Sequence, residues 1–166
     1  AIRNIVIRNS DVRYDVLSLP RKDHSFDKNH LWVTNLCADI DLPRLKNDDF
    51  LIDVKRMSFG EQSGFEVKQI STHIAIAPHS ATISDLHIAL ENSIIDLNQQ
   101  TFSYDSVKHI GNAIQQTPLN IRLKNAKINL CDFKAFVPAF SNFPNTFTLS
   151  CVVNGDKKKL TVSQLE

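Results

Sequence analysis

The stretch H-I-A-I-A-P-H-S-A-T-I-S-D-L-H-I-A-L, residues 73–90, decides the fold class. Ile74 and Ile76 alternate with small or polar residues, and Leu86, Ile88 and Leu90 do the same further on. This period of two is typical of half-buried β-strands, whereas a helix repeats its apolar residues every three or four positions. The stretch therefore predicts two consecutive strands, each with one apolar and one polar face.

The same alternation recurs along most of the chain and predicts about eleven or twelve strands. A change of phase near Asn35 predicts a β-bulge, and the phase shifts again before Met57. We expect a hairpin that turns at Asn9-Ser10, and further turns at 47–49 and 60–64. The expected strands are residues 2–8, 11–19, 31–45, 50–59, 65–67, 73–79, 81–90, 94–97, 101–104, 121–130, 146–153 and 158–162.

Helical patterns are rare in this sequence. Residues 105–116 have helical spacing, with Asp105 as the expected N-cap. Asp132 is expected to cap a second, short helix. Because the strands follow one another without long helical connections, the sheet should be antiparallel. Alternation alone leaves two all-β folds open: an elongated, curved, trough-like sheet, or a closed β-sandwich with the apolar faces as its core.

Composition narrows the functional classes. The net charge of +1 argues against a nucleic-acid binder held by bulk positive charge. Only 4 of 166 residues are glycine, which leaves little material for phosphate-binding loops or tight catalytic turns. The longest apolar run has about four residues, far short of the roughly 20 that a membrane-spanning helix needs. The chain begins at Ala1, and we expect residues 1–166 to be a single β-rich segment of a much longer chain.

The sequence carries none of the motifs of nucleotide binding, zinc proteolysis or α/β-hydrolase catalysis. We therefore expect no enzymatic activity, no catalytic residues, no metal and no cofactor. Cys37, Cys131 and Cys151 are interpreted as buried, inert thiols, although a Cys131–Cys151 disulfide stays open. The basic run 157–159 is interpreted as protection of an edge strand, with contact to anionic lipid headgroups as the alternative.

One feature of the sequence suggests a binding surface, namely the apolar faces of many consecutive strands. In a closed sandwich these faces are core, and in an open curved sheet they form a long apolar groove. The candidate groove residues are Ile52, Val54, Ile74, Ile76, Leu86, Ile88, Leu90, Ile121, Leu123, Ile128 and Leu130.

Several motifs in order resemble a known family. E-x-S-G-F at residues 61–65 follows the strand 50–59, and L-H-I-A-L-E-N-S-I-I occupies 86–95. D-F-x-x-F-x-P follows at 132–138, and V-N-G lies at 153–155 before a last strand. This order resembles the AsmA-like envelope proteins related to the translocation and assembly module subunit TamB, mainly from about residue 30 to the end.

The resemblance implies a fold and a role. Such proteins are anchored in the inner membrane and extend through the periplasm of Gram-negative bacteria as a β-trough with an apolar lining. They are associated with outer-membrane biogenesis and with phospholipid transport between membranes. The implied partners are a phospholipid or acyl chain and, in the full-length context, an outer-membrane assembly protein.

Other partners and functions follow from the residues alone. As a fragment, the chain could also dimerise through an exposed edge strand. The alternative function is a β-sandwich module that binds glycan or protein, and a β-rich enzyme is a third hypothesis. We expect no nucleic-acid partner.

Overall fold

The computed structural model describes residues 3–22, 25–155 and 160–163. Strands dominate the described chain, and its helical segments are short. The elements are β1 (Asn4–Asp15), β2 (His30–Lys46), β3 (Asp49–Glu61), β4 (Glu66–Ala77), β5 (Ser80–Ala89), β6 (Ile94–Leu97), β7 (Gln100–Ser103), η1 (Val107–His109), α1 (Ile110–Gln116), β8 (Leu119–Asn129), η2 (Leu130–Phe133), η3 (Pro138–Asn142), β9 (Thr146–Gly155) and β10 (Leu160–Ser163), where η marks a 3-10 helix.

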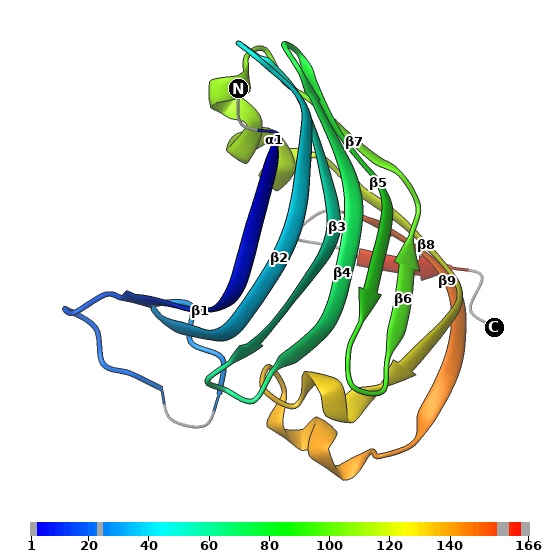
Figure 1. Cartoon of the computed structure of the whole chain (residues 1–166). Coiled ribbons are helices and arrows are strands. Elements are labelled where there is room, and N and C mark those ends of the chain that lie inside the picture. Colours follow the sequence, from blue (N-terminus) through cyan, green and yellow to red (C-terminus); the bar gives the residue numbers. More distant parts are fainter. Residues whose placement is uncertain (1–2, 23–24, 156–159, 164–166) are drawn as a thin grey trace.

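The described strands form one ten-stranded sheet in which every pairing is antiparallel. The strands lie almost in chain order, and β6 and β7 pair with successive parts of β5 (Figure 1). This order follows from the short turns, since a hairpin places each strand beside the previous one. The expected antiparallel, all-β sheet is confirmed.

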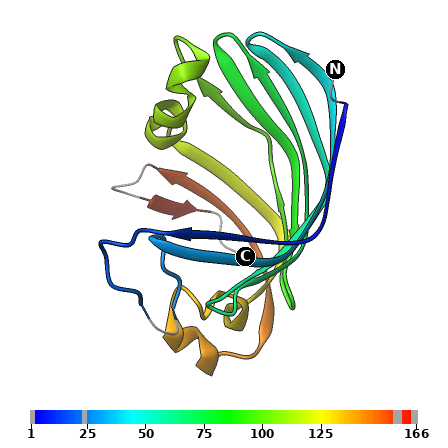
Figure 2. The same cartoon turned by 60° about the vertical axis from the view of Figure 1, so that its left-hand side comes forward.

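The sheet is strongly curved, and β1 and β2 bend together at one side of it (Figure 2). Bulges explain the bend, because an extra residue in one strand kinks it and increases its twist. Asn9 in β1 and Asn35 in β2 have positive φ angles of 44° and 53°, and both lie at register shifts. Asp85 in β5 and Asn125 in β8 also have positive φ angles and lie at register shifts.

The sheet does not close on itself. Its edge strands are β1 and β10, which do not pair with each other in the described part of the chain. The accessible surface is 11095 Å², against roughly 8,300 Å² for a compact monomer of this mass. A closed sandwich would bury that excess, so the sandwich alternative is wrong and the trough-like sheet is confirmed.

Three local predictions are wrong. Asn9-Ser10 is a bulge within the continuous strand β1 rather than a hairpin turn, because Asn9 adopts the left-handed conformation without reversing the chain. Ser106, not Asp105, occupies the cap position of η1, and it makes no side-chain cap bond. Asn129 caps η2 by accepting from the Cys131 amide, which leaves Asp132 to bond elsewhere.

Other local predictions are confirmed. The phase changes near Asn35 and before Met57 are both register shifts. The three cysteines are free, so Cys131 and Cys151 do not pair, but only Cys151 is buried as predicted, since Cys37 and Cys131 are half-buried. The turn predicted at residues 154–156 is described only in part. Gly155 ends β9, and Asp156 and the basic run 157–159 lie outside the described residues.

Candidate functional site

Apolar side chains run in rows across one face of the sheet. The longest row crosses six strands from β1 to β6, because cross-strand partners share a face. Shorter rows lie beside it on the same face. The longest row is Ile7, Ala38, Met57, Ile70, Ile88 and Ile95; the others are Ile5, Ile40 and Val54; Ile52, Ile74 and Ile83; and Phe50, Ile76, Ala81 and Phe102.

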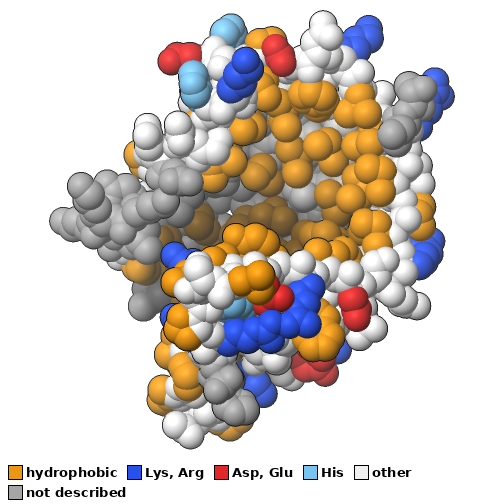
Figure 3. Space-filling view, turned by 90° about the vertical axis from the view of Figure 1, so that its left-hand side faces the viewer, with side chains coloured by type: hydrophobic (Ala, Val, Ile, Leu, Met, Phe, Trp, Pro, Cys, Tyr) orange, Lys and Arg blue, Asp and Glu red, His pale blue; other side chains and the backbone are white. Residues whose placement is uncertain are grey.

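This face is the hollow side of the molecule. Figure 3 shows a deep hollow lined almost wholly by hydrophobic side chains, with charged side chains gathered at its rims. Most of the lining side chains are only half-buried, as expected where a sheet face has no second layer over it. Because large contiguous apolar surfaces often mark places where proteins bind partners or ligands, the hollow is the candidate functional site.

Most of the groove residues predicted from the sequence lie on this face. Leu86 pairs with Leu97, and Ile121 and Leu123 pair with Val153 and Cys151 further along the sheet. The half-buried members of the predicted set are Ile52, Val54, Ile74, Ile76, Leu86, Ile88, Ile121, Leu123 and Leu130.

Three of the predicted residues differ from the rest. Leu90 and Ile128 are only 5% and 9% exposed, so they belong to a packed region rather than to the open wall. Leu130 lies in η2 rather than on a strand. The alternation could not separate these positions, because a covered and an uncovered apolar face have the same period.

The sequence prediction missed the part of the wall that β1 and β2 provide. Ile5, Ile7 and Ile40 continue the rows, and Met57 joins them across the β3 bulge. The signal was present, since these residues also alternate with polar ones. It was obscured because bulges at Asn9 and Asn35 reset the phase within single strands.

One end of the hollow is closed by packed loops. The amide of Phe26 donates to the carbonyl of Ala135 at 2.8 Å, which joins the segment 25–29 to the segment after η2. The ring of Phe136 lies 4.9 Å from that of Phe26 and 5.0 Å from that of Phe65. Ala135 is 2% exposed whereas Phe136 is 46% exposed, so these contacts join the loops while only part of the cluster is buried.

A buried polar cluster holds the same end together. Ser93 is fully buried, and its hydroxyl donates to a carboxylate oxygen of Asp132 at 2.6 Å. The other oxygen of Asp132 accepts from the side-chain amide of Asn92 at 3.0 Å. The amide of Asn129 donates to the Ser93 hydroxyl at 2.9 Å. Asp132 thus joins η2 to the turn between β5 and β6, which explains the aspartate of the D-F-x-x-F-x-P motif.

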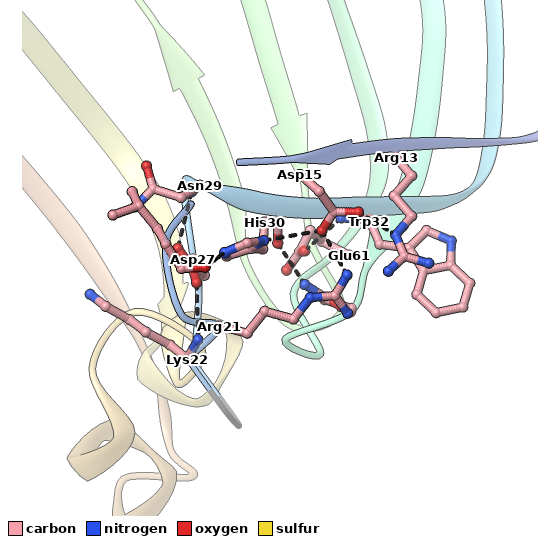
Figure 4. A network of polar contacts seen from close by, with 11 residues as sticks. Arg13, Asp15, Arg21, Lys22, Asp27, Asn29, His30, Trp32 and Glu61 are labelled. Carbon is pink, nitrogen blue, oxygen red and sulfur yellow. Dashed lines mark hydrogen bonds and ion pairs between the residues drawn. The ribbon is translucent and has the colours of Figure 1, made fainter. Parts of the chain in front are cut away.

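A second polar network orders the loop between β1 and β2 (Figure 4). The buried His30 bonds through Nδ1 to Asp15 at 3.1 Å and through Nε2 to the Leu19 carbonyl at 3.0 Å. Arg13 and Arg21 each reach Asp15 at 2.7 Å. The bond to His30 and the two guanidinium groups hold the pKa of Asp15 below its usual value.

The carboxylate of Asp27 anchors the same loop. It accepts from the amides of Asn29 and Lys22, both at 3.0 Å, and these bonds lower its pKa. These bonds tie the loop between β1 and β2 to the ends of both strands.

The convex face is polar and carries ion pairs along the sheet. Lys55 lies 2.5 Å from Asp41, and their contact lowers the pKa of Asp41 and raises that of Lys55. His73 lies 2.6 Å from Asp53, and this bond raises the pKa of His73. The two faces of the sheet therefore differ sharply, with charge outside and hydrocarbon inside.

Comparisons with protein-family models, curated proteins and solved structures found no match to this chain. Among the described residues, no helix has the length and apolar character to span a membrane. The same residues include no cluster of three or more His, Cys, Asp or Glu side chains that could hold a metal ion.

Proposed function

We propose that this chain is a non-enzymatic segment that binds the acyl chains of phospholipid or fatty acid on its concave face. The observation that carries the proposal is the uncovered apolar hollow, which runs across consecutive strands of one open sheet. Each methylene group transferred from water to such a surface contributes about 0.8 kcal/mol. The rows of the wall consist of apolar side chains, which suits ligands that share an acyl chain but differ in headgroup.

The proposal extends to the cellular role that the family resemblance implies. An AsmA- or TamB-like protein carries lipid along a trough between membranes, or serves outer-membrane biogenesis, in the periplasm of a Gram-negative bacterium. An open sheet with an apolar inside and a charged outside supports this role, because the outside keeps the trough in water while the inside shields hydrocarbon. No reacting group is needed, and the polar networks described above serve the fold.

Native mass spectrometry of the purified chain, followed by organic extraction, tests the proposal. We expect co-purified phospholipid or fatty acid in the wild-type protein. Ile88→Asp and Leu123→Asp place a carboxylate on the wall and should abolish lipid retention while the β-sheet circular dichroism spectrum persists. Lys124→Asp is the matched control, since Lys124 is exposed beside Leu123 and should leave retention unchanged.

Two results would count against the proposal. A lipid-free wild-type protein that also fails to take up added phospholipid would remove the binding role. Unfolding of both Ile88→Asp and Leu123→Asp would show that these positions are ordinary core.

A further inference from the structure

Strand β1 forms an edge of the sheet and pairs, among the described strands, with β2 alone. Several of its apolar side chains are exposed: Ile5, Val12 and Tyr14 are 39%, 52% and 55% exposed. An edge of this kind presents a row of free backbone N–H and C=O groups that can pair with another strand.

Two hydrogen bonds identify the backbone groups that point away from β2. The Arg3 carbonyl accepts from the Leu42 amide at 2.8 Å, and the Val16 amide donates to the Asn29 carbonyl at 2.8 Å. The direction alternates along an antiparallel strand, and the bulge at Asn9 shifts that alternation by one residue. The residues that face outward are Asn4, Val6, Arg8, Asp11, Arg13 and Asp15.

We propose that β1 pairs antiparallel with β1 of a second copy of this chain, about a twofold axis between Asn9 and Ser10. In this register, outward-facing residues meet outward-facing residues throughout. The hydrogen-bonded pairs are Asn4 with Asp15, Val6 with Arg13 and Arg8 with Asp11, each formed twice by the symmetry. The intervening pairs are Ile5 with Tyr14 and Ile7 with Val12.

Charge and hydrophobicity both match in this register. Arg8 of each copy faces Asp11 of the other, and within the described part of one chain Arg8 forms no salt bridge. Asp11 uses one oxygen to accept from the Asn35 amide at 3.0 Å and keeps the other for a partner. Ile5 and Ile7 meet apolar partners on the concave side, so the rows of the wall continue across the junction.

The bulge makes this edge selective for its own copy. A bulge disrupts the pairing of an edge with an ordinary straight strand, whereas a second β1 carries the same bulge at the twofold axis. A shift by one residue would set the apolar face of one strand against the polar face of the other. A shift by two would set Arg8 against Arg13, or move the two bulges out of line. The dimer would join two hollows into one surface, and its formation does not depend on what the hollow binds.

Sedimentation velocity over a concentration series tests the pairing. We expect the 18.8 kDa chain to reach twice that mass as its concentration rises. Arg8→Asp and Asp11→Arg should each weaken dimerisation about tenfold or more, because each puts like charges opposite one another twice. An equimolar mixture of the two variants should dimerise again, since position 8 of one then meets the opposite charge at position 11 of the other. Lys124→Asp should dimerise like the wild type.

The proposal is overturned if the wild type stays monomeric at every concentration, or if neither single variant weakens its dimer. A mixture that fails to recover would show that the register is wrong. Arg8→Asp should keep the wild-type circular dichroism spectrum, since Arg8 forms no salt bridge within the described chain. Lipid retention is read separately by mass spectrometry, so the failure of one proposal leaves the other intact.

Discussion

Two regions of this sheet carry apolar residues with the same alternation but differ in what covers them. Along the wall, side chains such as Ile74 and Ile88 are half-buried and face an open hollow. At the closed end, Leu90 is only 5% exposed, and the turn that follows it is joined through Asp132 to η2, some forty residues further along the chain. The closed end should therefore contribute more stability per side chain, and the wall more binding surface.

The largest expected effect is on the free energy of unfolding, and it compares Ile88 with Leu90, which lie two residues apart in the same alternation. Leu90→Ala should lower the free energy of unfolding by about 3 kcal/mol, because it opens a cavity in packed surroundings. Ile88→Ala should cost only about 1 kcal/mol, since its side chain is already partly in water. Urea unfolding of both variants measures the difference. Equal losses would mean that the wall is as tightly packed as the closed end.

The second effect concerns the polar cluster that holds the closed end. Asp132→Ala removes the acceptor of the Ser93 hydroxyl and of the Asn92 amide and should cost about 2 kcal/mol. Amide hydrogen exchange should then speed up in η2 and in the turn between β5 and β6, but not in β3. Exchange that rises evenly over the whole sheet would show that the cluster does not act locally.

The third effect tests the bulges that bend the wall. Asn35 has φ of 53°, a conformation that costs a β-branched residue about 1–2 kcal/mol. Asn35→Val should therefore destabilise the protein by about that amount, and Asn35→Gly should be close to neutral. Thermal unfolding monitored by circular dichroism compares the two. If both variants lost the same stability, the asparagine side chain rather than the backbone conformation would be what matters.

The alternation predicted most strands because a half-buried strand can be recognised from its own apolar and polar residues, without information about its neighbours. The bulge near Asn35 was predictable for the same reason, since it changes the phase of the pattern. Asn9 was misread as a turn because asparagine favours both turns and left-handed bulges, and only the pairing of β1 with β2 on both sides of it decides between them.

The candidate site could be predicted only in part. The sequence identifies which residues share a face, but not whether a second layer covers it. Ile88 and Leu90 lie two residues apart, yet Leu90 is only 5% exposed, and the turn that follows it bonds to Asp132, some forty residues away. The role of Asp132 could not be predicted either, because its partners Asn92 and Ser93 lie in the turn between β5 and β6, far from η2 in the sequence.

The smallest expected effect concerns the convex face. Its ion pairs are exposed to water, so we expect them to add little to the free energy of unfolding. The hydrogen bond that His73 donates to Asp53 raises the pKa of His73 above its ordinary value of 6.5. The stabilisation is therefore complete below pH 6.5 and is lost as the pH rises through the raised pKa. His73 is 60% exposed, so solvent screening limits the effect to about 0.3 kcal/mol. Urea unfolding of wild type and His73→Gln should differ more at pH 5.5 than at pH 8.5. If the difference in the free energy of unfolding were the same at both pH values, the pair would contribute through packing rather than charge. If the difference reached several kcal/mol, the convex face would stabilise the sheet as much as the closed end does.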